Sequence, residues 1–275
     1  MHAHTYESVR WFSFPSRRFP ARLTAGLAAL ALSAFAQDSA PIRGQWIIDG
    51  IGIPDQIELT LHRNFGGHGS STNSSSFRVD SLKGLSQAQM ASPAGSTVQF
   101  SIARDAGTLV CEGYFKQGNG AGTFTFSPDA NFAAEMRKLG YEVLKPDMFF
   151  SMAAHDVSLA YVRELRSLNI RPASADDLIS MRIHGVSVEF IKDLQSLGYG
   201  NLPADELVTM RIHGVTTDFI RELKSLGYDH PSADQLVTMR IHGVTPDYIH
   251  RLQARGMKNL SIDQMVSLRI HGIVD

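Results

Sequence analysis

Two residue types that could do chemistry recur at a fixed spacing in the C-terminal half of the chain. The sequence Arg-Ile-His-Gly occurs four times, each 29 residues after the last. Its arginines are Arg182, Arg211, Arg240 and Arg269, and its histidines are His184, His213, His242 and His271. His155 continues the histidine series one step earlier, where Ala153, Ala154 and Asp156 replace Arg, Ile and Gly. Imidazole binds metal ions and responds to pH, whereas guanidinium binds carboxylates and phosphates.

The spacing limits what these two rows can do. If successive units stack, equivalent side chains lie roughly 10 Å apart, which is too far for two histidines to share one metal ion. Each histidine either closes the last turn of a helix by binding free carbonyl groups, or belongs to a ladder that binds a ligand or responds to pH. Each arginine either pairs with an acid of a neighbouring unit, such as Asp218, Glu222 or Asp247, or binds phosphate. Both rows are candidate interaction residues, and we predict no metal and no cofactor.

Sequence motifs for catalysis are missing. We find no nucleophile elbow, no zinc signature and no paired carboxylates in a glycine-framed loop. His62 and His68 lie in the wrong kind of segment for a strong metal site. The sequence "GGHGSSTNSSS" at residues 66–76 lacks the lysine and the following helix of a phosphate loop, so we expect a mobile or edge loop whose Ser and Asn could contact a sugar or a peptide. The protein is therefore predicted to be non-enzymatic.

The sequence pattern of each 29-residue unit predicts two short helices. The first begins at an N-cap such as Thr216, carries Phe219 and Leu223 on one stripe, and ends at Gly227. The second begins after a serine such as Ser232, with Gln235 three residues on as in a capping box. Its apolar positions are Leu236, Val237, Met239 and Ile241, before Gly243.

Two helices of this size cannot bury both stripes alone, so neighbouring units must stack. With 43% hydrophobic and 19% charged residues, the 275-residue chain has a globular composition. We therefore predict an α-solenoid of about five 29-residue αα-hairpin repeats over residues 129–275.

Residues 44–128 predict a small antiparallel β-domain, which makes the fold class α+β. Ile57, Leu59 and Leu61 alternate with polar residues, as in half-buried strands. The sequences "ARDAG" (103–107) and "KQGNGAG" (116–122) predict turns. We expect five or six strands, with Trp46 and Phe115 in the core and the helices covering one end. The single cysteine, Cys111, lies in an alternating apolar segment, which favours core packing over reactivity.

The N-terminal sequence predicts that the protein is exported. Four arginines precede the apolar run at residues 23–36, and Ala34 and Ala36 form a cleavage site. We assign residues 1–36 to a signal peptide and 37–43 to a short linker, and expect a periplasmic or extracellular protein after cleavage near Ala36. An uncleaved anchor, a buried helix and a later start codon are the alternatives. The mature chain would hold 22 basic and 26 acidic residues and no other long apolar stretch, so no stable membrane insertion is expected.

The sequence "I-H-G-V-T" resembles the turn of helix-hairpin-helix modules, which bind DNA phosphates. Its second glycine is replaced here by Ser187, Thr216 and Thr245. Residues 129–275 contain 16 basic and 19 acidic side chains. Because nucleic-acid binding depends on an excess of positive charge, no nucleic-acid partner is predicted.

A second resemblance covers residues 129–275. Repeats of the type "RIHGVTPxFIRELxxLGY" resemble the C-terminal extracytoplasmic parts of bacterial proteins related to the BlaR1-like M56 metallopeptidases. The sequences "RDAGTLVCEGYF" and "GNGAGTFTF" resemble the β-rich segment that often precedes such repeats. The chain contains neither H-E-x-x-H nor the family's membrane helices, so the resemblance implies no peptidase activity.

These observations favour an exported, non-enzymatic binding or scaffold protein that contacts another protein or a cell-envelope component. One alternative is an envelope sensor or regulatory module related to BlaR1-like signalling. Others are a hydrolase that uses the serine-rich segment and a helix-hairpin-helix nucleic-acid binder.

Overall fold

A computed structural model of the chain describes residues 41–49, 56–64, 70–143 and 145–273. The predicted signal peptide at residues 1–36, most of the predicted linker, and His68 lie outside these ranges. Within them, no helix combines the length and the apolar character needed to span a bilayer.

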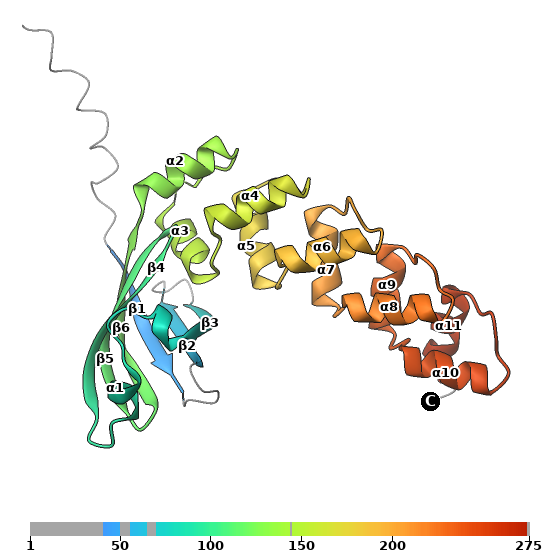
Figure 1. Cartoon of the computed structure of the whole chain (residues 1–275), viewed down its shortest axis with the longest axis horizontal. Helices are drawn as coiled ribbons and strands as arrows, with labels where there is room; N and C mark the ends of the chain where they lie inside the picture. Colours follow the sequence, from blue (N-terminus) through green and yellow to red (C-terminus); the bar gives the residue numbers. More distant parts are fainter. Residues whose placement is uncertain (1–40, 50–55, 65–69, 144, 274–275) are drawn as a thin grey trace, which may run out of the picture. The chain divides into compact units, whose positions relative to one another are not determined.

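Six antiparallel strands form one sheet in the order β3-β2-β1-β6-β5-β4 (Figure 1). The strands are β1 Ile42–Ile48, β2 Gln56–Asn64, β3 Ser70–Arg78, β4 Ser96–Arg104, β5 Gly107–Lys116 and β6 Asn119–Pro128. The short helices η2 (Val79–Ser81) and α1 (Gln87–Ala91) lie between β3 and β4. The strands begin two residues before the predicted range 44–128, and the prediction of an antiparallel sheet of five or six strands is confirmed.

The alternating apolar residues of the strands build the core on one face of the sheet. Trp46 and Phe115 are fully buried, as predicted, with ring centroids 5.5 Å apart. Gly113 and Gly122 pair directly opposite each other beneath Trp46, and a Cβ atom on either would lie 2.6–2.7 Å from the indole. The indole Nε1 donates a hydrogen bond to the carbonyl oxygen of Glu112 (3.1 Å). Only glycine therefore fits at these two positions.

Both predicted turns are confirmed, and one predicted loop is wrong. Arg104 pairs with Gly107 across the first turn, and Lys116 pairs with Asn119 across the second. Residues 70–76 of the serine-rich segment are not a loop, because they form most of β3 and pair with β2 in continuous register. Strand preference depends on context, and here nine consecutive pairs with β2 outweigh the weak strand propensity of serine and asparagine.

Ten helices of nine residues each follow the sheet within the described ranges, so the α+β class is confirmed. They are α2 Ala130–Lys138, α3 Pro146–Ala154, α4 Leu159–Ser167, α5 Ala175–Ile183, α6 Val188–Ser196, α7 Ala204–Ile212, α8 Thr217–Ser225, α9 Ala233–Ile241, α10 Pro246–Ala254 and α11 Ile262–Ile270.

The ends of these helices are set by the predicted caps. The Thr216 side chain accepts a hydrogen bond from the Phe219 amide at the start of α8. Ser232 and Gln235 form a reciprocal capping box at the start of α9. Helix α8 ends before Gly227, whose φ of +90° is readily adopted by glycine.

Contacts between the helices follow a regular order. Helices α5, α7, α9 and α11 contact one another in sequence, and so do α2, α4, α6, α8 and α10. Helix α3 contacts α5 and also packs on the sheet against β1, β5 and β6, with Phe150 stacked on Phe124 at 5.5 Å (Figure 1). Arg63 of β2 also forms an ion pair with Asp147 of α3 (2.7 Å). The sheet and the first helices therefore share one continuous core.

Candidate binding surfaces

The arginine row lies between consecutive Arg-Ile-His-Gly segments. Each guanidinium carbon lies 5.0–5.1 Å from the ring centroid of an aromatic residue 21 positions earlier in the chain. The pairs are Arg182 with Tyr161, Arg211 with Phe190, Arg240 with Phe219 and Arg269 with Tyr248. At this distance a guanidinium is attracted to the face of the ring. All four arginines are half-buried, so their main contact is with the protein itself.

The predicted pairing of this row with acids is wrong for Arg211 and Arg240. Within the described residues neither makes an ion pair, and the Nε of each is buried without a hydrogen-bond partner. Asp218, a predicted partner, pairs with Arg221 instead (2.7 Å). Arg182 is the exception, because an aspartate replaces glycine in the segment before it: its Nη2 lies 3.5 Å from Asp156.

The four histidines of the Arg-Ile-His-Gly segments cap helices through their backbone, as His155 does at the end of α3. His184, His213, His242 and His271 are the C-cap residues of α5, α7, α9 and α11. The predicted bond from imidazole to a free carbonyl is found at His271, whose Nδ1 lies 2.7 Å from the Ser267 oxygen. In the described part of the chain the other three imidazoles make no hydrogen bond. His184 and His213 are exposed, and His242 is half-buried.

The isoleucine before each histidine is a surface residue, which the sequence analysis missed. Ile183, Ile212, Ile241 and Ile270 are 52%, 54%, 54% and 59% exposed. The assignment of Ile241 to the apolar face of its helix was therefore wrong. Leu236 and Met239 are buried, and Ile241 lies five residues after Leu236, about 140° around the helix. Helical periodicity alone would have placed it outside the buried stripe.

The four isoleucines and the histidines that follow them form a recurring surface, which we call the Ile-His row. Single exposed apolar side chains are common and need no explanation. Here the same large side chain is half exposed at four equivalent positions. Among the described residues, the other large apolar side chains that are exposed are Val110, Tyr114 and Ile273. This recurrence at equivalent positions makes the four isoleucines a candidate interaction surface.

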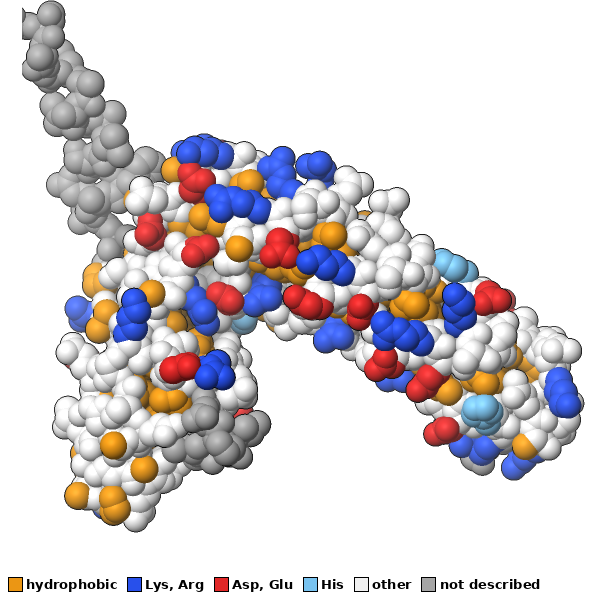
Figure 2. Space-filling model, in the orientation of Figure 1, with side chains coloured by type: hydrophobic (Ala, Val, Ile, Leu, Met, Phe, Trp, Pro, Cys, Tyr) orange, Lys and Arg blue, Asp and Glu red, His pale blue; other side chains and the backbone are white. Residues whose placement is uncertain are grey.

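A second surface of the helices carries ion pairs. Arg163 pairs with Glu135 (3.2 Å), Lys192 with Glu164 (3.4 Å) and Arg221 with Asp193 (3.6 Å), each reaching back to the preceding helix of the α2–α4–α6–α8 series. Figure 2 shows acidic and basic side chains interspersed over the helices on the face in view. We call this face the salt-bridged surface; exposed pairs of this kind contribute little stability.

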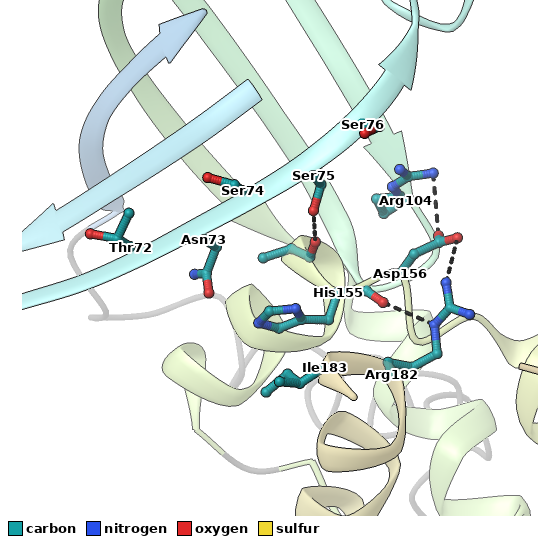
Figure 3. A pocket seen from close by; sticks show the side chains of 11 residues that line it. Thr72, Asn73, Ser74, Ser75, Ser76, Arg104, His155, Asp156, Arg182 and Ile183 are labelled. Atoms are coloured by element: carbon teal, nitrogen blue, oxygen red, sulfur yellow. Dashed lines mark hydrogen bonds and ion pairs between the residues drawn. The ribbon is translucent and has the colours of Figure 1, made fainter. Parts of the chain in front are cut away.

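A polar groove of about 470 Å³ lies beside β3 (Figure 3). One wall is β3 itself, and the others come from β4, from the C-terminal ends of α3 and α5, and from the turn after α3. The lining residues are Thr72, Asn73, Ser74, Ser75, Ser76, Arg104, Ala154, His155, Asp156, Arg182 and Ile183. The groove therefore joins hydroxyl and amide groups of the serine-rich strand to the first members of the two predicted rows.

Charged groups gather at one end of the groove. The Asp156 carboxylate lies between Arg104 and Arg182, with oxygen-to-nitrogen distances of 3.2 and 3.5 Å (Figure 3). Arg104 also stacks on Phe77 (5.1 Å), and its Nε is buried without a hydrogen-bond partner among the described residues. Burial, and then the charge of Arg182, lower the pKa of His155 below its ordinary value of 6.5, which favours the neutral imidazole.

The groups in this groove are suited to binding a polar ligand. The Ser75 hydroxyl donates to the carbonyl oxygen of Ala154 (3.4 Å) rather than to an imidazole. No group of three or more His, Cys, Asp or Glu side chains in the described ranges is placed to hold a metal ion.

Burial raises the pKa of Cys111 to about 12, which makes this thiol a weak nucleophile.

Comparisons of the chain with protein-family models, with curated proteins and with solved structures gave no match. The resemblance to the BlaR1-like repeat region stays a prediction.

Proposed function

We propose that this chain is an exported, non-enzymatic binding or scaffold protein that presents the Ile-His row to a protein partner. The observation that carries the proposal is the exposure of one large apolar side chain, 52–59%, at four equivalent positions. Burying these side chains against a partner removes apolar surface from water, which is the main favourable contribution in most protein–protein association.

In this proposal the helices form an α-solenoid of about five 29-residue αα-hairpin repeats. The starts of α5, α7, α9 and α11 support it, because they lie 29 residues apart at 175, 204, 233 and 262. The contacts between successive members of each helix series also support it. So does the arginine row, because the guanidinium groups of Arg211 and Arg240 lie beside Gly185 and Gly214 of the preceding unit, 3.2 Å from where a Cβ atom would be. In a solenoid each unit is stabilised by its neighbours in this way.

The partner surface that we propose is an amphipathic helix. Packed helices lie about 8–10 Å apart, so equivalent isoleucines on α5, α7, α9 and α11 would recur at about that interval. Seven residues of a partner helix advance about 10.5 Å. A partner with one large apolar side chain every two turns would therefore meet successive isoleucines, and the imidazoles could accept or donate hydrogen bonds beside them.

Export is part of the proposal and is supported by the sequence of residues 1–36 alone. The arginine flank, the apolar run and the small residues at 34 and 36 are typical of a signal peptide. The partner would then be a protein of the cell envelope.

Site-specific photo-crosslinking of the full chain tests this function. A photoreactive amino acid at position 212 or 241 should yield one shared crosslinked protein. The matched controls carry it at positions 192 and 221, which lie on the salt-bridged surface. Equal crosslinking from both surfaces, or none from positions 212 and 241, would contradict the proposal.

A further inference from the structure

Strand β3 is an edge of the sheet, and its outer side makes no backbone hydrogen bond to another described residue. Edge strands present unpaired N–H and C=O groups, and proteins usually protect them with charged residues, proline, bulges or a covering segment. The other edge is partly covered: Lys83 exchanges two backbone hydrogen bonds with Ser101 of β4 (3.1 and 2.8 Å). Residues 70–77 of β3 contain no charged residue and no proline, and their register with β2 has no bulge.

The groove lies along this edge. Five consecutive residues of β3, at positions 72–76, line it, although neighbouring side chains of a strand point to opposite faces. Figure 3 shows these residues along one strand, opposite His155 and Ile183. The strand's backbone edge therefore forms the wall, and the hydrogen bond from Ser75 to Ala154 is the one bond that crosses from this wall to α3 in the described part of the chain.

Positive charge exceeds negative charge at one end of the groove. Two guanidinium groups, from Arg104 and Arg182, face the single carboxylate of Asp156, so the cluster has a net positive charge. Their contacts of 3.2 and 3.5 Å are longer than the 2.7–2.9 Å of strong charge-assisted hydrogen bonds. The lowered pKa of His155 favours its neutral form, so the positive charge here is that of the two arginines.

We propose that this groove binds an extended peptide segment that pairs with the backbone of β3 and places a carboxylate against Arg104 and Arg182. Its volume of about 470 Å³ lies within the range of ligand sites, which allows a few residues in extended form. Addition of a peptide strand to an open sheet edge is a known recognition mode, in which main-chain hydrogen bonds give affinity and neighbouring pockets give specificity. Ile183, 52% exposed, supplies an apolar contact on the opposite wall.

The first experiment offers the purified full chain three immobilised libraries of random hexapeptides that lack Asp and Glu at the random positions. One library has a free C-terminal carboxylate, the second a C-terminal amide, and the third an amide with one fixed glutamate. We expect enrichment from a library that carries a carboxylate and none from the plain amide. The first library identifies a C-terminal carboxylate and the third a side-chain carboxylate. No enrichment, or equal enrichment from all three, would overturn the proposal.

The second experiment uses the enriched peptide itself. Arg104→Gln and Arg182→Gln should each weaken its binding about tenfold or more, because hydrogen bonds to charged groups are lost. Arg211→Gln, at the equivalent position outside the groove, should leave the dissociation constant within about twofold, given the typical insensitivity of distant sites. N-methylation along the peptide should abolish binding at alternate positions, because alternate amides of a strand face its partner. Binding that is insensitive to every N-methyl group would refute strand pairing even if an arginine variant failed to fold.

Discussion

The contacts that stabilise the sheet join residues far apart in the sequence, whereas the contacts that stabilise the helices join residues closer together. In the sheet, Trp46 packs over glycines more than sixty residues later, and β1 pairs with both β2 and β6. In the helices, each arginine reaches a ring 21 residues earlier, and each helix contacts the next member of its own series. The sheet should therefore unfold as one unit, whereas the helices depend on their nearest neighbours.

The same difference separates the two candidate surfaces. The Ile-His row repeats because its residues belong to a recurring sequence. The groove occurs where the first helices meet the sheet, and it uses Arg104 of β4 together with Asp156, which replaces a glycine of that sequence. A recurring surface is suited to a long partner, and a groove with its own charged end is suited to one segment.

The largest expected effect lies in the sheet. In Gly122→Val the new Cβ would collide with the carbonyl oxygen of Glu112 and lie 2.7 Å from the Trp46 indole. We expect a loss of about 3 kcal/mol or more of unfolding free energy, or no folded sheet. Urea unfolding followed by Trp46 fluorescence measures it. Gly200→Ala, which meets no atom within 4 Å, is the control and should change stability little.

Truncating one fully buried leucine in each region compares the stability of the two regions directly. Leu59→Ala in β2 and Leu223→Ala in α8 should each cost about 2–5 kcal/mol. Hydrogen exchange should show lost protection throughout the sheet for Leu59→Ala, and loss centred on α6, α8 and α10 for Leu223→Ala. Loss of protection over the whole chain in both variants would remove the distinction between the regions.

Each side chain of the arginine row should contribute less to the free energy of unfolding than a fully buried leucine does. Arg240→Ala removes the contact with the Phe219 ring, for which about 0.5–2 kcal/mol is expected. Because the Arg240 Nε is buried without a hydrogen-bond partner among the described residues, Arg240→Met, which keeps an apolar stem, should cost less than Arg240→Ala. Thermal unfolding of both variants checks this order, and Arg255→Ala at an exposed position is the control.

The smallest expected effect is the pH dependence of the free energy of unfolding that His155 causes. The pKa of this imidazole is lowered in the folded state, so below pH 6.5 the unfolded chain binds more protons than the folded one. The free energy of unfolding should therefore fall as the pH drops from about 6.5 through the folded pKa. His155→Gln should lose that contribution. Parallel urea titrations at pH 7.5 and pH 5 measure the difference, and identical pH dependence in the two proteins would contradict it.

Local features of the fold could be predicted from the sequence because they depend on neighbouring residues. Thr216, Ser232 and Gly227 cap helices through contacts within a few residues, and the turns at 103–107 and 116–122 are equally local. Strand β3 could not be predicted this way. Its serines favour a loop by composition, and its pairing with β2 makes it a strand.

The candidate surfaces needed the three-dimensional arrangement. Arg211 stacks on Phe190 rather than pairing with an acidic side chain. The spacing of residues in the sequence does not show which ring this arginine will contact. The groove brings residues 72–76 next to Arg104, Asp156 and Arg182, which the fold alone places together. The Ile-His row is different, because the helical period already separates Ile241 from Leu236 and Met239.

The most direct test of the proposed function is the affinity of the crosslinked partner for the double variant Ile212→Ser/Ile241→Ser. Each isoleucine is 54% exposed, so burying the exposed part in a complex should contribute about 1 kcal/mol per side chain. Calorimetric titration should therefore show a dissociation constant about tenfold or more above that of the wild-type protein, with Lys192→Ser/Arg221→Ser unchanged. An unchanged dissociation constant for the isoleucine variant would contradict the assignment of the Ile-His row as the binding surface.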